Sequence, residues 1–457
     1  MRCLLPALLL ALLPVTPAAG ESQQDAVRIG SRLELLADEF LIQTMDGDVG
    51  HQIHQPEPHE VAIVTDKPWE GNTCAYYTVF QDGDIYRMYY RGSHFDEQTR
   101  KPAHREVTCY AESRNGIDWT KPNLGLIDWE GSTANNIVLD GLGTHCFCAF
   151  RDDRPGVPAA ARYKGFSRGN PKGLYIFQSP DGLDWTQMQD KAVITNGAFD
   201  SQNLAFWDPV RNEYRAFWRY FGNGVRSIRT ATSRDFIHWG TDADLKYGDA
   251  PAQHLYTNAI RKYPRAPHIY VGFPTRYQPK NSQVEPVFMI SRDGVNFRKY
   301  LAALIPITAP KDRDGNRSNY MANGLIQIPG NHREYSVFGS EAYYTGPDSR
   351  LRRFSFRVDG FVSVSAGSQG GTLVTKPLIF TGSKLNLNYT TGKAGAIAVR
   401  LKEIGSEKSL TARLTGDEIA GTVEWNSGKS LARFAGRPVV LTFDLKQASL
   451  YSLQFRQ

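Results

Sequence analysis

Three acidic residues have neighbours that suit them to chemistry on a bound ligand. Glu70 lies in the segment Pro-Trp-Glu-Gly-Asn, Asp200 lies in Phe-Asp-Ser-Gln-Asn, and Glu341 follows a serine. When one carboxyl group is held protonated and a second is ionised, the pair can act as general acid and as base or nucleophile. A plainer interpretation of each is a solvated loop carboxylate or a turn-capping Asp. We predict Glu70, Asp200 and Glu341 as the candidate catalytic residues.

A set of arginines stands at a regular distance from tyrosines. In three segments an Arg follows a Tyr by five residues and in a fourth by six, the arginines being Arg91, Arg168, Arg219 and Arg276. Glu341 takes the later position in a fifth segment. Guanidinium groups bind carboxylate or sulfate bidentately, so the set favours an anionic ligand. The alternative is structural, since arginines at strand ends can also tie neighbouring sheets together.

An internal repeat indicates the elements that position these residues. Each copy has a Ser or Arg at a strand end, a turn, and an aromatic residue that begins the next strand. The copies run from Ser113 to Trp119, Ser179 to Trp185, Ser233 to Trp239, Ser291 to Phe297 and, in degenerate form, Arg357 to Phe361. Asp-Gly and Asn-Gly tolerate the positive φ of tight hairpin turns. The copies recur every 54–66 residues, which suits a four-stranded propeller blade with its loops.

A second hairpin precedes each copy, which gives four strands per repeat and five repeats. No segment of comparable length has a convincing helical period. The predicted fold is therefore all-β, with a five-bladed β-propeller over 66–365 and a small antiparallel β-sandwich over 366–457. The sandwich strands are expected at Ala396–Leu401, Gly421–Trp425, Val439–Leu445 and Leu450–Phe455.

The innermost strands of the five blades are expected to begin near Glu70, Gly143, Asp200, His254 and Asn319. Glu70 and Asp200 would then face one mouth of the propeller axis. The second strand of each blade runs back to that mouth, so the arginines and Glu341 should gather there too.

The N-terminal residues indicate export. Residues 1–20 have a basic Arg2, an apolar run from Leu4 to Leu13 and then small residues, as in a secretory signal peptide, and 21–65 form a lead-in segment. The apolar run is too short to span a bilayer. We expect a secreted or periplasmic protein with no membrane partner. The net charge of +6 is dispersed along the chain, and no nucleic-acid partner is expected.

Four cysteines remain once Cys3 leaves with the signal peptide: Cys74, Cys109, Cys146 and Cys148. We expect buried or bridged thiols. A zinc site is not predicted, because the Cys-x-Cys pair has no second Cys or His cluster at ligand spacing.

The five repeats, the Ser-x-Asp-Gly-x-x-Trp hairpin and the C-terminal sandwich together resemble the five-bladed glycoside hydrolases of families 32, 43, 62 and 68. The resemblance implies an axial funnel in which paired carboxylates cleave a glycosidic bond of an oligosaccharide or polysaccharide. The Trp-x-Asn-Asp-Pro, Arg-Asp-Pro and Glu-Cys signatures of the fructan-cleaving members are missing, which leaves the sugar open. The substrate-binding candidates are Trp69, Arg91, Arg168, Gln202, Asn203, Arg219, His254, Arg276 and Asn323.

Two other functions remain open on the same fold. One is a glycoside phosphorylase or transferase, and the other is a non-catalytic carbohydrate-binding propeller. No cofactor and no metal ligand set is predicted. The resembling hydrolases sometimes hold calcium on the axis, where His254 or His145 would contribute, although a lone His beside a strand is more often a satisfied polar group.

Overall fold

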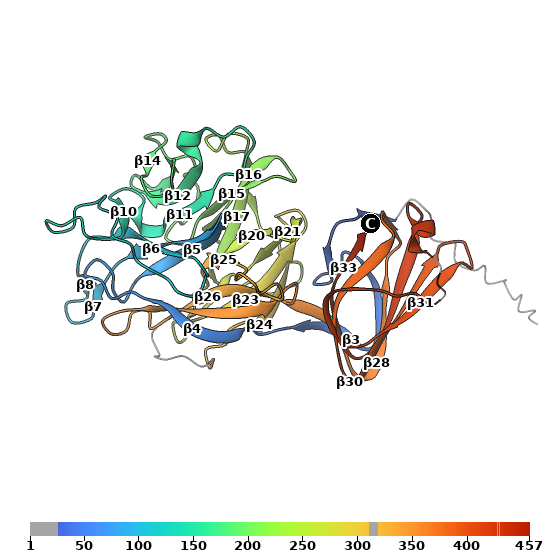
Figure 1. The fold of residues 1–457 in the computed structure, drawn as a ribbon. Helices are drawn as coiled ribbons and strands as arrows, with labels where there is room; N and C mark the ends of the chain where they lie inside the picture. The colour runs from blue at the N-terminus through green and yellow to red at the C-terminus, as the bar shows by residue number, and fades with distance from the viewer. Residues whose placement is uncertain (1–25, 310–318, 427, 429) are drawn as a thin grey trace, which may run out of the picture.

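The computed structural model describes residues 26–309, 319–426, 428 and 430–457. Figure 1 shows a propeller with a smaller β-sandwich beside it. The described residues are almost all in strands and loops, with 3-10 helices only at Thr144–Cys146, Ala159–Ala161 and Leu431–Phe434. The prediction of an all-β chain with a five-bladed propeller and a sandwich is confirmed. The predicted signal peptide lies outside the described residues.

The first three blades are antiparallel sheets whose strands follow one another outward from the axis. The first blade contains β5 (Ala75–Asp82), β6 (Ile85–Gly92), β9 (Val107–Ser113) and β10 (Ile137–Asp140), with a small hairpin of β7 (Phe95–Asp96) and β8 (Lys101–Pro102) between β6 and β9. The second contains β11 (Cys148–Arg151), β12 (Tyr163–Gly169), β13 (Gly173–Ser179) and β14 (Thr186–Gln187). The third contains β15 (Leu204–Asp208), β16 (Glu213–Gly222), β17 (Val225–Ser233) and β18 (Ala243–Asp244).

The fourth and fifth blades are less regular. In the fourth, the first and second strands are each split in two, giving β19 (Leu255–Thr257), β20 (Ile260–Tyr263), β21 (Ala266–Gly272), β22 (Thr275–Gln278), β23 (Gln283–Ser291) and β24 (Phe297–Ala303). The fifth contains β26 (Glu334–Glu341), β27 (Arg350–Arg357) and β4 (Glu57–Val64). Its innermost segment carries β25 (Asn323–Gly324), which pairs in parallel with β5 of the first blade. The ring is therefore closed at its centre by β25 and at its rim by the N-terminal strand β4.

The repeated turn is held by side-chain hydrogen bonds to the backbone. In the second blade, Ser179 Oγ accepts from the Gly182 amide at 2.8 Å, and Asp181 Oδ1 accepts from the Leu183 amide at 2.8 Å. The same two bonds recur in the first, third and fourth blades. Gly182 has a φ of +81°, as the sequence predicts for this position, whereas Phe236 occupies it in the third blade with a φ of +72°.

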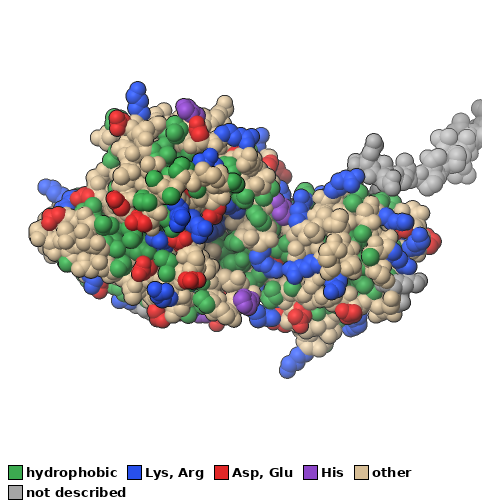
Figure 2. Space-filling view, turned by 45° about the horizontal axis from the view of Figure 1, so that its top comes forward, with side chains coloured by type: hydrophobic (Ala, Val, Ile, Leu, Met, Phe, Trp, Pro, Cys, Tyr) green, Lys and Arg blue, Asp and Glu red, His purple; other side chains and the backbone are tan. Residues whose placement is uncertain are grey.

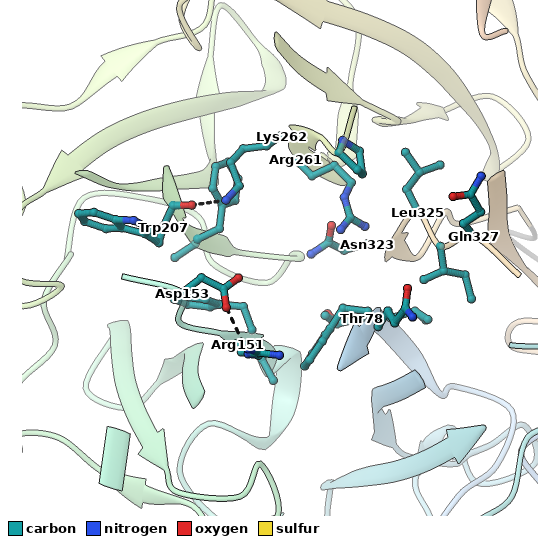
Figure 3. A pocket seen from close by; sticks show the side chains of 18 of the residues that line it. Thr78, Arg151, Asp153, Trp207, Arg261, Lys262, Asn323, Leu325 and Gln327 are labelled. Carbon is teal, nitrogen blue, oxygen red and sulfur yellow. Dashed lines mark hydrogen bonds and ion pairs between the residues drawn. The ribbon is translucent and has the colours of Figure 1, made fainter. Parts of the chain in front are cut away.

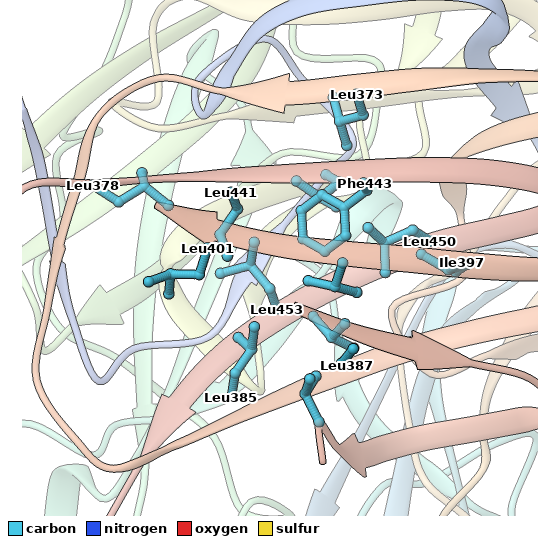
Figure 4. Packing of buried hydrophobic residues seen from close by; sticks show 14 of the residues in the cluster. Leu373, Leu378, Leu385, Leu387, Ile397, Leu401, Leu441, Phe443, Leu450 and Leu453 are labelled. Atoms are coloured by element: carbon cyan, nitrogen blue, oxygen red, sulfur yellow. The ribbon is translucent and has the colours of Figure 1, made fainter. Parts of the chain in front are cut away.

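The C-terminal body is one curled sheet of nine strands around a single hydrophobic core. Long strands dominate it, and Figure 4 shows Leu387, Leu401, Phe443 and Leu453 packed between them. The strands from the C-terminal part of the chain are β28 (Val362–Thr375), β29 (Leu378–Phe380), β30 (Lys384–Glu403), β31 (Ser409–Leu414), β32 (Asp417–Thr422) and β33 (Val439–Arg456). The two strands expected at 439–445 and 450–455 are one continuous strand, β33, because Gln447 with a φ of +45° bends the strand without ending it.

The lead-in segment divides between the two bodies. Strands β1 (Val27–Gly30), β2 (Glu34–Leu35) and β3 (Ile42–Ile53) belong to the sandwich sheet, and β4 belongs to the fifth blade. Strand β1 pairs with β29 in parallel, so the sheet is not wholly antiparallel. The fifth copy of the repeat is degenerate because the chain passes from it into β28 of the sandwich, while β4 supplies the outer strand of that blade.

Charged side chains of both signs are interspersed on the face seen in Figure 2, in keeping with the dispersed charge of the sequence. None of the helices in the described residues has the length and hydrophobicity needed to cross a lipid bilayer.

Candidate functional site

Asp200 lies at a mouth of the propeller axis, just before the innermost strand of the third blade. Its side chain is 50% exposed. Tyr76 donates a hydrogen bond from its hydroxyl to Asp200 Oδ1 at 3.0 Å, and His145 Nε2 lies 2.8 Å from the same oxygen. The hydrogen bond from His145 holds the pKa of Asp200 far below its usual range, and it outweighs burial, which acts in the opposite direction. Asp200 is therefore an ionised carboxylate that solvent or a ligand can reach.

A second carboxylate stands on the other side of His145. Glu106 Oε2 lies 2.9 Å from His145 Nδ1, and Glu106 Oε1 lies 3.5 Å from Arg91 Nη1. Burial raises the pKa of Glu106, but the His145 hydrogen bond and the Arg91 charge together bring it below its usual value. Because both ring nitrogens face carboxylate oxygens, only the imidazolium form of His145 can donate to both. The three side chains form a hydrogen-bonded relay from Glu106 through His145 to Asp200.

Sequence reasoning did not identify this relay. Glu106 was not a candidate, and His145 was considered only as a calcium ligand. Strand direction could have identified Glu106. The loop between the second and third strands of a blade lies at the same mouth as the start of the first strand. Glu106 immediately precedes β9, so the rule that placed Arg91 at the mouth also places Glu106 there.

Five tyrosines form the wall of a narrow cavity beside Asp200. They are Tyr76, Tyr77, Tyr256, Tyr320 and Tyr343, and Gln202 lines the cavity with them. Tyr256 and Tyr320 meet edge to face with ring centroids 5.3 Å apart, and Tyr320 and Tyr343 do so at 5.4 Å. The space between the rings is about 10 Å³, roughly that of one water molecule, so the tyrosines form a closed aromatic wall beside Asp200.

Three of the four predicted arginines gather around this relay. Arg91 is buried, and its Nη2 donates to the Thr73 carbonyl at 2.7 Å and to the Tyr343 hydroxyl at 3.0 Å. Arg168 and Arg219 line an open hollow of about 450 Å³ that also contains Asp200. Arg219 Nη1 is buried there without a hydrogen-bond partner.

The other predicted arginine is structural. Arg276 Nη2 donates to Glu285 at 2.7 Å within the fourth blade, and Nη1 donates to the Leu301 carbonyl. The contacts of Arg276 are those of an arginine that links neighbouring strands, which is the structural alternative given above.

The two other candidate catalytic residues lie in buried ion pairs. Glu70 is 1% exposed, and its oxygens accept hydrogen bonds from the Tyr90 hydroxyl and from Lys121 Nζ, both at 2.5 Å. Glu341 is 2% exposed and pairs with Arg352 Nε at 2.5 Å. The structure thus places Asp200 in the open and the two glutamates in the packed interior.

The remaining substrate-binding candidates have varied positions. Trp69 Nε1 donates to Asn136 Oδ1, and Gln202 lines the tyrosine cavity while its Nε2 donates to the Tyr77 carbonyl. Asn203 is buried, with its amide nitrogen bonded to the Phe199 and Ser201 carbonyls. The backbone amide of Arg226 donates to His254 Nδ1, and Asn323 lines a pocket at the opposite end of the innermost strands.

No group of three or more His, Cys, Asp and Glu side chains in the described residues is arranged to hold a metal ion. Both nitrogens of His145 face Glu106 and Asp200. The four cysteines 74, 109, 146 and 148 are free and buried.

No protein-family model matches the chain. Two proteins from strains of Mycobacterium tuberculosis, both named as uncharacterised, are 31% and 30% identical to it over 158 and 162 residues. Each match covers 33% of this chain and 47% of the relative, so the chain spans about half the length of the curated relatives it matches.

Solved structures with a similar fold include carbohydrate-active enzymes. One named as a glycoside hydrolase is 16% identical, with a TM-score of 0.46, over 66% of this chain and 92% of its own. A family 43 arabinoxylan arabinofuranohydrolase from Bacillus subtilis is 12% identical, with a TM-score of 0.44, over 86% and 98%. A β-1,2-mannobiose phosphorylase from Listeria innocua is 10% identical, with a TM-score of 0.46, over 66% and 97%.

Proposed function

We propose that this propeller cleaves a glycosidic bond at the mouth that contains Asp200. The observation that carries the proposal is the relay from Glu106 through His145 to a half-exposed, ionised Asp200. Glycosidic cleavage needs an ionised carboxylate near the anomeric carbon and a proton donor near the leaving oxygen. Asp200 meets the first need as nucleophile or base, and His145 holds the Asp200 carboxylate in place through the 2.8 Å contact.

The proton donor of a glycosidase stands about 5 Å or more from its nucleophile or base. His145, at 2.8 Å from Asp200 Oδ1, therefore acts on Asp200 and not on the leaving oxygen. Glu106 is a positioning residue, because its Oε2 lies 2.9 Å from the other ring nitrogen and fixes the orientation of the imidazole. The open hollow of about 450 Å³ that contains Asp200, Arg168 and Arg219 would receive the sugar ring.

The substrate in this proposal carries a negative charge, as a uronic or sulfated sugar does. The hollow beside Asp200 is lined by Arg168, Lys172 and Arg219, so cations outnumber the single carboxylate. The free Nη1 of Arg219 can bind an oxyanion. The N-terminal residues support export of the protein, which would bring it to polysaccharide outside the cytoplasm.

The same cations favour a glycoside phosphorylase as the second candidate function. Inorganic phosphate bound by Arg168 and Arg219 would attack in place of water. A requirement for phosphate, with a sugar phosphate as the product, would identify this reaction.

The test is a panel of neutral and acidic oligosaccharides, assayed with and without phosphate for the wild type and matched variants. Asp200→Asn should lower kcat by at least about 100-fold, as expected when a catalytic base is removed. The control is Asp184→Asn, an exposed carboxylate in the turn of the second blade, which should keep full activity. Unimpaired cleavage by Asp200→Asn would refute the proposal, and cleavage of neutral sugars alone would refute the anionic substrate.

A further inference from the structure

A second pocket lies at the other end of the innermost strands, opposite the mouth that contains Asp200. It has a volume of about 410 Å³, and Figure 3 looks into it. The labelled side chains come from all five blades, including Thr78, Arg151, Trp207, Arg261 and Asn323. The pocket therefore lies on the propeller axis, and it is independent of the function proposed for the first mouth.

Arg261 is the unusual group in this pocket. Its Nε is buried with no hydrogen-bond partner, and no ion pair to its guanidinium is found within the described residues. Burial lowers the pKa of Arg261 to about 10, which still leaves it charged at neutral pH. The ionisable groups that act on it are the Tyr335 phenol and the Cys148 thiol, and the pKa of each is raised, so both are neutral there.

The two other basic side chains that line the pocket have ion-pair or hydrogen-bond partners, in contrast to Arg261. Arg151 pairs with Asp82 and with Asp153, each at 3.2 Å, and Lys262 donates to the Trp207 carbonyl. The pocket lining contains two arginines and one lysine but only one acidic residue, Asp153. A partly desolvated guanidinium without a counter-ion is costly, and an anion that enters the pocket would remove that cost.

Asn323 is a second polar side chain of the pocket that has an unpaired atom. Its Oδ1 is buried without a hydrogen-bond partner, and Figure 3 shows it directed into the same space as Arg261. A carbonyl oxygen accepts hydrogen bonds, so the ligand should offer a hydroxyl or N–H group at this position. Aromatic residues such as Phe80, Phe206 and Tyr335 complete the wall.

We propose that this pocket binds a small hydroxycarboxylate, with its carboxylate on Arg261 and a hydroxyl group donating to Asn323 Oδ1. A guanidinium binds a planar carboxylate through two parallel hydrogen bonds, and 410 Å³ is within the range of small-molecule sites. Inorganic phosphate is also an anion, but it has no carbon-bound hydroxyl group to donate to Asn323. The test therefore measures phosphate binding separately.

The experiment is calorimetric titration of the full chain with D-glucuronate, with lactate, with inorganic phosphate and with neutral glucose. Glucuronate or lactate should bind and raise the melting temperature, whereas glucose should not. Arg261→Met should weaken that binding by at least about tenfold. The matched control is Arg413→Met, an exposed arginine of the sandwich, which should leave this binding unchanged.

A second variant tests the same inference without removing the arginine. Asn323→Asp places a carboxylate beside Arg261, so it should pair with the guanidinium, raise the melting temperature without ligand and abolish binding. The proposal is overturned if neither acid binds the wild type, if only phosphate binds, or if Arg261→Met and Asn323→Asp bind the acids as the wild type does.

Discussion

Glu70, which we predict as a catalytic residue, takes part in buried contacts that hold the first blade together. Glu70 has Trp, Gly and Asn beside it, yet its two oxygens are taken by Tyr90 and Lys121 in the interior of the first blade. The Lys121 side chain is only 12% exposed, and its charge is shared between the buried Glu70 at 2.5 Å and the half-exposed Asp66 at 3.1 Å. Removing one partner of a buried ion pair leaves the other charge uncompensated, which costs more than the pair itself contributes.

We therefore expect Glu70→Gln to lower the free energy of unfolding by about 1–3 kcal/mol, because Lys121 loses its buried partner and keeps only the half-exposed Asp66. The folded fraction should keep the wild-type kcat on any substrate that the protein cleaves. Chemical denaturation combined with active-site titration measures both quantities.

Two variants make the Glu70 result specific. Glu130→Gln, an exposed glutamate of the same blade, should change stability by less than about 0.5 kcal/mol. Glu70→Gln combined with Lys121→Met removes both charges and should recover much of the loss. A stable Glu70→Gln protein with no activity would instead indicate that Glu70 is catalytic.

The sequence predicts the position of a site residue only where the direction of its strand is enough to place it. Asp200, Arg91, Arg168 and Arg219 were placed at the mouth from the direction of their strands. Which carboxylate faces solvent depends on partners distant in the sequence, such as Lys121 for Glu70, and no local pattern indicates these pairs. Likewise, the link of His145 to both Glu106 and Asp200 joins residues 39 and 55 positions apart.

The turn that ends the third strand of each blade is the most regular element of the chain. Asp181 Oδ1 accepts hydrogen bonds from the backbone amides of Leu183 and Asp184 at 2.8 and 3.0 Å. Trp185 Nε1 closes the turn by donating to the Gly182 carbonyl at 3.1 Å. Because these bonds are local, the sequence predicts them directly.

We expect Asp181→Ala to destabilise the protein by about 1–2 kcal/mol, since two backbone amides lose a charged acceptor. Asp184→Ala in the same turn removes an exposed carboxylate whose side chain makes no such bond, and its effect should be within about 0.5 kcal/mol. Urea denaturation of the two variants gives the comparison. Equal stability of both would mean that the turn is held by its backbone and by Trp185 alone.

Strands that pair across long stretches of sequence were the ones that sequence reasoning left unassigned. Strand β3 pairs with β28, for example Gln52 with Ser363, and β4 pairs with β27, for example Ile63 with Leu351. The lead-in segment carries no turn signal that would identify its partners, which lie about 300 residues later. Five blades could be counted from local hairpins, but the closure of the ring by β4 could not.

The propeller and the sandwich are joined by polar contacts that are themselves buried. Arg292, in the turn of the fourth blade, donates to Asp38 at 2.9 Å and pairs with Glu34, which belongs to sandwich strand β2. In the fifth blade, Asp359 accepts from Ser452 of β33 at 2.6 Å. The turns of the fourth and fifth blades therefore hold the sandwich against the propeller.

The pKa of Glu34 makes this junction sensitive to acid. Burial raises the pKa of Glu34, but the hydrogen bond from His268 and the charge of Arg292 outweigh it and lower the pKa to about 2. The usual value for Glu is about 4.3. A carboxyl group whose pKa is lower in the folded state stabilises that state above its usual pKa, and the contribution is lost as pH falls through the folded value.

Glu34→Gln should therefore lower the free energy of unfolding by about 3 kcal/mol at pH 7, the size that a shift from about 4.3 to about 2 implies. The deficit should stay constant down to about pH 5, shrink between about pH 4 and pH 2, and vanish below that, because protonated Glu34 then matches the neutral amide. Denaturation curves of the variant and of Glu424→Gln, an exposed sandwich glutamate, measured at several pH values, provide the test. A Glu34→Gln deficit that persists unchanged at pH 2 would show that packing at β2, rather than the charge of Glu34, joins the two bodies.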